Sequence, residues 1–286
     1  MNGQQNVEDR SVLLTDVGFS YRDGELTLRD ISLDIRKPQL VSIIGPNGAG
    51  KSTLIHCINR ILSPSEGTVM VDGTDVSGIG IKELARKVGY VPCSSGDCFP
   101  LSVVDTVLMG RNPHTGLRRN LHSDMEVVEE VLDLMDIRPL AMRMLNELSA
   151  GQRQRVMLAR GLAQEPGVLL LDEPTANLDI RHQMDVARIL KELSAAKGMV
   201  VIMISHDINL ASRYSDSIVL MSEGSIYAAG RPLEVVTAEN IKAVYGVDSE
   251  IALRGNRPFV HLLDPVFESE EAVLASDGTA SIPGGA

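Results

Sequence analysis

Positions 45–52 of this sequence have the residue types and spacing of a phosphate-binding loop. They read Gly-Pro-Asn-Gly-Ala-Gly-Lys-Ser, which matches the pattern G-x-x-x-x-G-K-[ST]. Glycines let the main chain curl until its N–H groups converge on phosphate oxygens, and a following helix points its positive end at the same anion. Lys51 would reach the terminal phosphates of a nucleoside triphosphate, and the Ser52 hydroxyl would bind Mg²⁺, which prefers oxygen ligands. The predicted nucleotide contacts are Gly45, Pro46, Asn47, Gly48, Ala49, Gly50, Lys51, Ser52 and Thr53.

A second candidate group is a pair of acids at the end of an apolar stretch. Asp172 and Glu173 directly follow Val168–Leu171, a run that is typical of a buried strand. The first carboxylate can hold Mg²⁺ through water beside a phosphate loop, and the second can polarise a water for in-line attack on the γ-phosphate. We therefore assign Asp172 to the metal and Glu173 to general-base catalysis. A solvated acidic turn is the alternative for such a pair considered alone.

These residues need a fold that brings strand ends together, and the hydrophobic pattern predicts one. Short apolar runs bounded by turn residues read as strands. They are Val12–Val17, Ile31–Ile35, Leu40–Ile44, Thr68–Val71, Val88–Val91, Val168–Leu171, Val200–Ile204 and Ile218–Met221. Helices are predicted at Lys51–Leu62 and Arg181–Lys197. Strands that alternate with helices imply an α/β fold with a mostly parallel sheet covered on both faces.

Two parts of the sequence depart from that alternation. From about 95 to 163, apolar residues recur three and four apart, so this stretch is predicted to be a helical insert. Its helices are predicted at Val103–Met109, Asp124–Met135 and Gln152–Leu162. After Gly230 we expect short helices at Pro232–Thr237 and Asn240–Gly246, then a strand pair around Glu250 and Phe259. From about 266 the chain is rich in Ser, Gly and acids, and we predict that it stays disordered.

Composition excludes several classes of protein. Of the 286 residues 44% are hydrophobic, enough for a sizeable core, but no apolar run approaches the about 20 residues of a membrane-spanning helix. The net charge of −11 and the 3% aromatic content argue against a nucleic-acid partner, because phosphate backbones select basic faces. The first ten residues do not have the pattern of a secretory signal. Three cysteines without framework-like spacing fit a reducing cytosol.

Further motifs resemble the ATP-binding-cassette (ABC) family and occur in the order of that family. Residues 148–152, Leu-Ser-Ala-Gly-Gln, resemble its LSGGQ sequence with alanine in place of one glycine. Positions 176–179, Ala-Asn-Leu-Asp, match its dimer-interface loop, and 205–207, Ser-His-Asp, match its switch histidine. The resemblance implies that adenine stacks on Tyr21 and that His206 bonds the γ-phosphate. It also implies contacts to the ATP of a second copy from Ser149, Ala150, Gly151, Gln152 and Asp179.

The resemblance covers about residues 11–247 and implies both an architecture and an assembly. The fold would be a P-loop NTPase (RecA-like) core with an antiparallel β subdomain and the helical insert. A C-terminal extension would follow at 248–286. In this family two cassettes close head to tail over two ATP molecules with Mg²⁺, so we expect a homodimer that hydrolyses ATP.

Three segments resemble a narrower group, the uptake subfamily for iron–siderophore, haem and cobalamin. They are Asp97–Arg111, His206–Asp216 and Met221–Gly246. The resemblance implies an importer subunit that lies peripherally on the cytoplasmic face of the cell membrane. It would dock under an integral membrane permease through a groove near Phe99–Arg111, and a periplasmic or extracellular substrate-binding protein would deliver the substrate. An ordinary amphipathic helix face is the alternative interpretation of the docking segment.

One position departs from the family pattern. After Gly89–Pro92 the family has a glutamine whose side-chain oxygen reaches Mg²⁺ and the attacking water, whereas this chain has Cys93. Sulfur is soft, suits Mg²⁺ poorly and reaches less far than the amide. We therefore predict slower hydrolysis or looser coupling to the permease, with ATP binding kept. A metal site or redox switch of Cys93 with Cys98 is an alternative that lacks further ligands, and Cys57 and Cys98 are interpreted as small buried thiols.

Two other functions fit parts of the pattern. A cassette protein acting on ribosomes or DNA ends would carry two cassettes or long coiled coils, but this chain has one phosphate loop and no heptad run. A nucleotide-binding scaffold inactivated at Cys93 is the other, although the chain keeps Lys51, both acids and His206. The sequence does not identify the transported substrate, because specificity lies in the permease and its binding protein.

Overall fold

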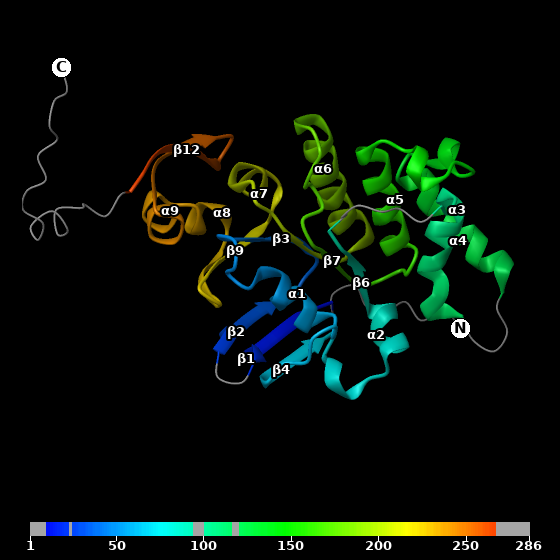
Figure 1. Ribbon diagram of the computed structural model, residues 1–286, viewed down its shortest axis with the longest axis horizontal. Coiled ribbons are helices and arrows are strands. Elements are labelled where there is room, and N and C mark those ends of the chain that lie inside the picture. The colour runs from blue at the N-terminus through cyan, green and yellow to red at the C-terminus, as the bar shows by residue number, and fades with distance from the viewer. Residues whose placement is uncertain (1–9, 23–24, 94–99, 116–119, 267–286) are drawn as a thin grey trace, which may run out of the picture.

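A computed structural model describes residues 10–22, 25–93, 100–115 and 120–266. Its centre is a six-stranded sheet with the strand order β10-β9-β3-β8-β7-β6 (Figure 1). The strands are β3 (Gln39–Ile44), β6 (Val88–Val91), β7 (Val168–Leu171), β8 (Val200–Ile204), β9 (Ser217–Ser222) and β10 (Ser225–Gly230). Neighbours in this sheet are parallel except for the β9–β10 pair. The predicted α/β class with a mostly parallel sheet is therefore confirmed.

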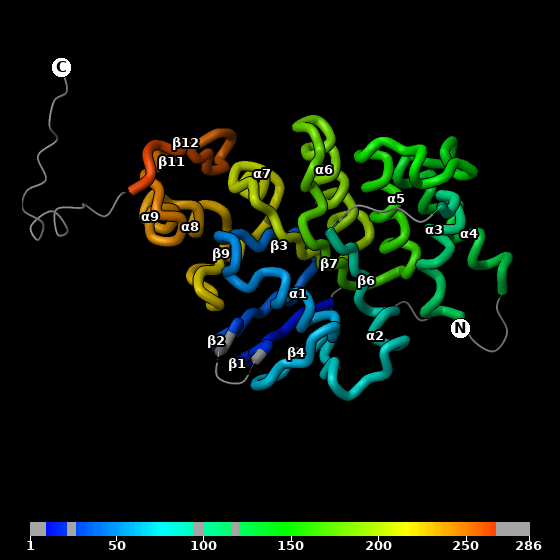
Figure 2. Tube along the Cα trace, viewed as in Figure 1, coloured from blue at the N-terminus to red at the C-terminus, as the bar shows by residue number. Residues whose placement is uncertain are grey.

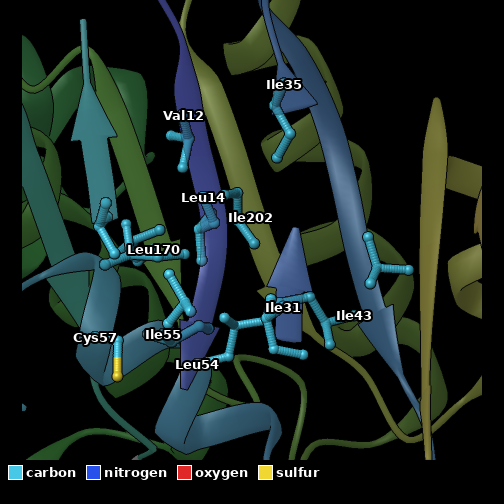
Figure 3. Close-up of a cluster of buried hydrophobic side chains, with 14 of the residues drawn as sticks. Val12, Leu14, Ile31, Ile35, Ile43, Leu54, Ile55, Cys57, Leu170 and Ile202 are labelled. Atoms are coloured by element: carbon cyan, nitrogen blue, oxygen red, sulfur yellow. The ribbon is translucent and has the colours of Figure 1, made fainter. Parts of the chain in front are cut away.

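The central strands are buried on both faces, which explains why they are apolar without interruption. In β7, Val168 and Leu170 belong to one hydrophobic cluster, while Leu169 and Leu171 belong to another on the opposite face. Successive side chains of a strand point to opposite faces, so one apolar run can fill two cores. Figure 3 shows Leu170 among the side chains of the first cluster.

A second, antiparallel sheet covers part of that first face, with the order β2-β1-β4-β5. Its strands are β1 (Val12–Arg22), β2 (Glu25–Ile35), β4 (Glu66–Val71) and β5 (Thr74–Asp75). Val12 and Leu14 of β1 pack with Leu54 and Ile55 of α1 (Lys51–Ile58) in the shared core (Figure 3). This sheet is the antiparallel β subdomain that the family resemblance implies.

The predicted helix at Lys51–Leu62 is one turn shorter in the structure. Helix α1 ends at Ile58, and Arg60 adopts a left-handed conformation with φ of 58°. The Arg60 guanidinium donates hydrogen bonds to the carbonyls of Val76 and Ile79, at 3.0 and 2.5 Å. These bonds turn the chain toward α2 (Ile81–Lys87), a tertiary effect that the apolar spacing does not reveal.

The helical insert is present, with α3 (Val103–Leu108), α4 (Leu121–Leu134) and α5 (Ala150–Leu162) packed together (Figure 1). Helix α4 begins one turn before its predicted start, because Asn120 caps it. Arg111, which is 5% exposed, connects the segment after α3 with α4 and with the chain between α5 and β7. Its guanidinium bonds the Asp124 carboxylate at 3.1 Å, the Ala163 carbonyl at 2.7 Å and Glu165 at 2.6 Å.

The chain after the last sheet strand forms a compact C-terminal segment, shown at the left of Figure 1 and traced in Figure 2. It consists of α8 (Pro232–Val235), α9 (Ala238–Tyr245), β11 (Val247–Arg254) and β12 (Arg257–Pro265). Strands β11 and β12 form an antiparallel hairpin, so the predicted strand pair is confirmed. The acidic end, for which disorder is predicted, lies outside the described residues, which end at 266.

Two further helices follow central strands of the sheet: α6 (Ile180–Lys197) comes after β7, and α7 (Ile208–Tyr214) comes after β8. Helix α6 is capped at its C-terminal end by Gly198, whose φ of 58° is a left-handed conformation that favours glycine. Within the described ranges, no helix combines the length and the apolar character needed to cross a membrane.

Candidate nucleotide site

The predicted phosphate loop connects β3 to α1 at the carboxyl edge of the sheet. Gly48 and Gly50 both adopt left-handed conformations, with φ of 80° and 90°. A side chain on Gly50 would meet Leu28 at 2.8 Å, so the loop needs glycine for both its conformation and its packing. The loop therefore leads directly into the N-terminal end of α1, where main-chain N–H groups of the first turn have no helical partner.

Lys51 lies over the loop instead of pointing into solvent. Its ammonium donates to the carbonyls of Gly45 and Pro46, at 2.8 and 2.7 Å. Burial lowers the pKa of Lys51, and the carboxylates of Glu173 and Asp172 oppose that shift. A buried cation held between a main-chain turn and two acids is prepared to bind an anion that enters the loop.

Ser52 and Asp172 meet although 120 positions separate them. The Ser52 hydroxyl donates to the Asp172 carboxylate at 3.1 Å. Asp172 is 8% exposed, and this burial raises its pKa, against the opposing effect of the Ser52 hydrogen bond. The Asp172 N–H also donates to the Val91 carbonyl at 2.9 Å, which fixes the end of β7 beside the end of β6. The two oxygen groups predicted to serve a metal are thus adjacent.

Glu173 and His206 form the other close pair of the site. The distance between the Glu173 carboxylate and Nε2 of His206 is 2.5 Å. Glu173 has a φ of 50°, an uncommon conformation for a residue with a side chain. His206 is in the turn between β8 and α7, so the pair joins the ends of two neighbouring parallel strands. The structure therefore brings both predicted catalytic residues together beside the phosphate loop.

Tyr21 lies at the edge of this group and is 60% exposed. Its hydroxyl is 3.2 Å from Oγ1 of Thr53, in the first turn of α1. The ring of Phe19 contacts it edge to face, with ring centroids 4.8 Å apart. An aromatic ring held from behind and open in front can accept a stacked base.

The Ser149 segment lies at the start of α5, on an element separate from the phosphate loop. Ser149 and Gln152 form a capping box, in which Gln152 N–H donates to the Ser149 hydroxyl at 3.3 Å and Ser149 N–H donates to the Gln152 amide oxygen at 3.0 Å. Ala150 is an exposed first-turn helix residue, so replacing a glycine there costs no contact. Gly151 packs against His182, where any Cβ would lie 2.6 Å from the imidazole.

Asp179 neighbours the Ser149 segment through that same histidine. Its carboxylate caps α6, accepting from the His182 N–H at 2.9 Å and pairing with His182 Nδ1 at 2.8 Å. These hydrogen bonds lower the pKa of Asp179, which is exposed. The residues predicted to contact a second nucleotide thus form one group at the starts of α5 and α6, in which Ser149, Ala150 and Asp179 are exposed.

Cys93 follows β6 by two residues and is half-buried. Burial raises the pKa of its thiol, and the charges of Glu173 and Asp172 add to the shift. A neutral thiol consequently stands beside the acid pair. Cys57 is fully buried, and burial raises its pKa to about 11, as expected of an inert core thiol. Cys98 lies outside the described residues, as do positions 94–99 of the predicted docking segment.

Sequence reasoning missed a pair next to Asp172. His56 is one turn along α1 from Ser52, and its Nε2 is 3.0 Å from the Tyr90 hydroxyl of β6. Burial and the charges of Asp172 and Cys93 raise the pKa of Tyr90 to about 12. The i,i+4 spacing of Ser52 and His56 could have shown that both occupy one helix face.

Comparisons with known proteins support one family. A protein-family model described as ABC transporter matches residues 28–176. An uncharacterized ABC transporter ATP-binding protein of Methanocaldococcus jannaschii is 45% identical over 235 residues, which are 82% of this chain and 91% of that protein. The cobalamin import ATP-binding protein BtuD of Halobacterium salinarum is 37% identical over 262 residues, 92% of this chain and 65% of that protein. A structure described as a metal-chelate type ABC transporter in an inward-facing conformation has a TM-score of 0.76 at 28% identity, covering 90% of this chain and 97% of that one.

Proposed function

This chain belongs to the ABC transporter family, whose ATP-binding subunits hydrolyse ATP to power transport, and we propose that it energises an importer for iron–siderophore, haem or cobalamin. Two relatives support this substrate class, one named for cobalamin import and one described as a metal-chelate transporter. The segments that resemble the uptake subfamily point in the same direction.

The observation that carries the proposal is the meeting of two residue pairs at one edge of the sheet. Ser52 bonds Asp172, and the next residue, Glu173, bonds His206. In open α/β folds ligands bind outside the carboxyl ends of the parallel strands. Here the carboxyl ends of β3, β7 and β8 lie next to each other. The phosphate loop with Lys51 follows β3, the two acids follow β7, and His206 follows β8.

This arrangement can support attack of water on the γ-phosphate. Glu173 accepts a proton from the water. At the same time the water oxygen bonds to the γ-phosphorus, and the bond from that phosphorus to ADP breaks. Lys51 and the loop amides stabilise the charge on the phosphate oxygens. His206 holds Glu173 in place and offers its imidazole to the γ-phosphate.

The oxygen groups of Ser52 and Asp172 fit Mg²⁺. Across the described positions, no three His, Cys, Asp or Glu side chains gather as a metal site, so the ion would take its other ligands from phosphates and water. The buried Asp172 carboxylate gains a counter-charge when a cation binds. Mg²⁺ would neutralise the phosphate charge that develops during hydrolysis.

The second half of the proposed site comes from another copy of the chain. Ser149 and Asp179 are exposed. Their segments lie side by side because His182, which pairs with Asp179, packs against Gly151. The helix start after Ser149 offers an anion site, which would serve the ATP of the partner in a head-to-tail homodimer. The dimer would dock on an integral membrane permease at the cytoplasmic face of the membrane and respond indirectly to a substrate-binding protein.

The test uses Glu173→Gln, which removes the proton acceptor and leaves the shape of the side chain. We expect it to bind ATP normally, to lose at least about 100-fold in turnover and to form ATP-dependent dimers in light scattering. The matched control is Glu83→Gln, an exposed acid on α2 that should behave as wild type.

Stimulation separates transport from other uses of a cassette. We expect a permease of the uptake subfamily in liposomes to raise the ATPase rate, whereas DNA, RNA or ribosomes leave it unchanged. Stimulation by nucleic acid alone would refute the importer and favour the non-transport ATPase. Retained turnover in Glu173→Gln would refute the assignment of the base.

A further inference from the structure

The C-terminal hairpin β11–β12 is fastened to α7 by the side chain of Asn209. Its Nδ2 donates to the carbonyl of Val260 at 3.1 Å, and its Oδ1 accepts from the N–H of the same residue at 2.7 Å. One side-chain amide therefore pairs with both main-chain groups of a hairpin residue, as a neighbouring strand would. The 51 positions between the two residues make this a purely tertiary link.

Further contacts fix the rest of α7 on the hairpin. The Ser212 hydroxyl donates to the Pro258 carbonyl at 2.5 Å. Arg257 donates to the carbonyls of Ser212 and Ser215, at 3.3 and 2.5 Å. Val260 is 4% exposed and packs in an apolar cluster that includes residues of α7, α8 and α9. The hairpin thus touches α7 from its first turn to its end.

Helix α7 begins two residues after the site residue His206. Asp207 caps it by accepting from the Leu210 N–H at 2.9 Å, and His206 directly precedes this cap. A cavity of about 430 Å³ lies between the hairpin and the site, bounded by Val260 and Leu262 on one side and by Glu173 and His206 on the other. The hairpin is therefore connected to the turn that carries His206 through α7.

The stability of α7 depends on these contacts. It has seven residues, and isolated helices shorter than about 12–15 residues are marginal in water. Small displacements of positioning groups can reduce catalysis by about 100-fold. The location of the imidazole therefore depends on what α7 packs against, in addition to the end of β8, where the Ser205 N–H donates to the Ile43 carbonyl at 3.0 Å.

We propose that the C-terminal hairpin holds His206 against Glu173, and that Asn209 is the positioning residue through which it acts. This inference rests on the proposed function, in which His206 and Glu173 act on the γ-phosphate. It gives the hairpin a part in hydrolysis, although the hairpin supplies neither of the two catalytic side chains.

The test compares Asn209→Ala with Asn240→Ala. Asn240 lies on α9 in the same C-terminal segment, and its Nδ2 likewise donates to a main-chain carbonyl, that of Val235, at 2.8 Å. We expect Asn209→Ala to lower kcat about tenfold and to leave the KM for ATP within about twofold. Asn240→Ala should leave both within about twofold. Amide hydrogen exchange at residues 205–214 should become faster in Asn209→Ala only.

Each outcome decides the matter. Equal kcat in both variants, or a loss in Asn209→Ala that appears only in KM, would overturn the inference. If Asn209→Ala does not fold, Asn209→Asp replaces it. Its carboxylate still accepts from the Val260 N–H but cannot donate to the Val260 carbonyl and is repelled by it, so kcat should again fall; wild-type kcat in that variant would also overturn the inference. If wild type itself shows no turnover, the proposed function fails instead, so the two failures are distinct.

Discussion

The two halves of the predicted nucleotide site, the phosphate loop before α1 and the Ser149 segment before α5, differ in how they are tied to the chain. Both place the start of a helix where an anion can bind. The loop is tied to a distant part of the chain through the Ser52 bond to Asp172, while Lys51 bonds the carbonyls of the loop itself. Among the described residues, Ser149 makes its hydrogen bonds within its own first helical turn.

The difference separates binding from turnover. One copy of the chain brings together the groups proposed to hold a triphosphate and its metal. The Ser149 half is complete as a helix cap but exposed, and in the proposed function it acts only when a second copy meets it. Removal of the loop's phosphate-binding groups should therefore reduce nucleotide affinity, and substitutions in the Ser149 half should reduce only hydrolysis.

The largest effect is expected from Lys51→Ala. Loss of a charged hydrogen bond to phosphate should weaken ATP binding by about 100-fold, because such bonds contribute about 1.5–3 kcal/mol, and turnover should vanish. Fluorescent-nucleotide titration and phosphate release measure both quantities. Lys82→Ala, an exposed lysine on α2, is the control. Unchanged affinity in Lys51→Ala would remove the basis of the whole site.

Ser149→Ala should distinguish most clearly between an effect on turnover and an effect on ATP binding. We expect kcat to fall about tenfold with ATP affinity unchanged, and loss of the cap to cost about 1 kcal/mol of stability. Thr237→Ala removes a matching cap from α9, where the Thr237 hydroxyl accepts from Asn240 N–H at 3.2 Å. It should lose the same stability and keep its turnover. Equal kcat in the two variants would place Ser149 outside the site.

Cys93→Gln should strengthen the first half. The longer amide would supply an oxygen beside Asp172 and Glu173, so the rate of ATP hydrolysis should rise severalfold with affinity unchanged. Cys93→Ala tests whether removal of sulfur alone is sufficient, and it should stay at or below the wild-type rate. An unchanged or lower rate in Cys93→Gln would contradict the idea that Cys93 limits turnover.

The smallest effect concerns stability against pH, and the two halves should differ in sign. Burial raises the pKa of Asp172 above its ordinary 3.8, so its contribution to stability is present below that value and is lost as pH rises through the raised pKa. At pH 7 Asp172→Asn should therefore raise the Tm of the nucleotide-free protein slightly. The gain should disappear at acid pH.

Asp179 should behave in the opposite way. Hydrogen bonds from His182 lower its pKa, so its stabilisation is present above the ordinary pKa and is lost as pH falls through the lowered one. Asp179→Asn should slightly lower the Tm at pH 7 and have no effect at low pH. Thermal unfolding at several pH values measures both variants, and shifts of the same sign would contradict this account.

The sequence by itself determined the local features of this protein. The glycines of the phosphate loop, the apolar strand runs and the acids behind β7 are short-range patterns whose conformations follow from sterics and burial. For that reason β6, β7 and β8 coincide with their predicted bounds. The ends of α1 and α4 do not, because the Arg60 bonds and the Asn120 cap decide them.

Only the tertiary structure decided which distant residues meet. Strand order places the end of β7 beside that of β8, and so joins Glu173 to His206 across 33 positions. It also pairs His56 with Tyr90 and fastens Asn209 to Val260. Such contacts depend on how strands are ordered and packed, and hydrophobic periodicity carries no information about that order, since every buried strand shows the same apolar run.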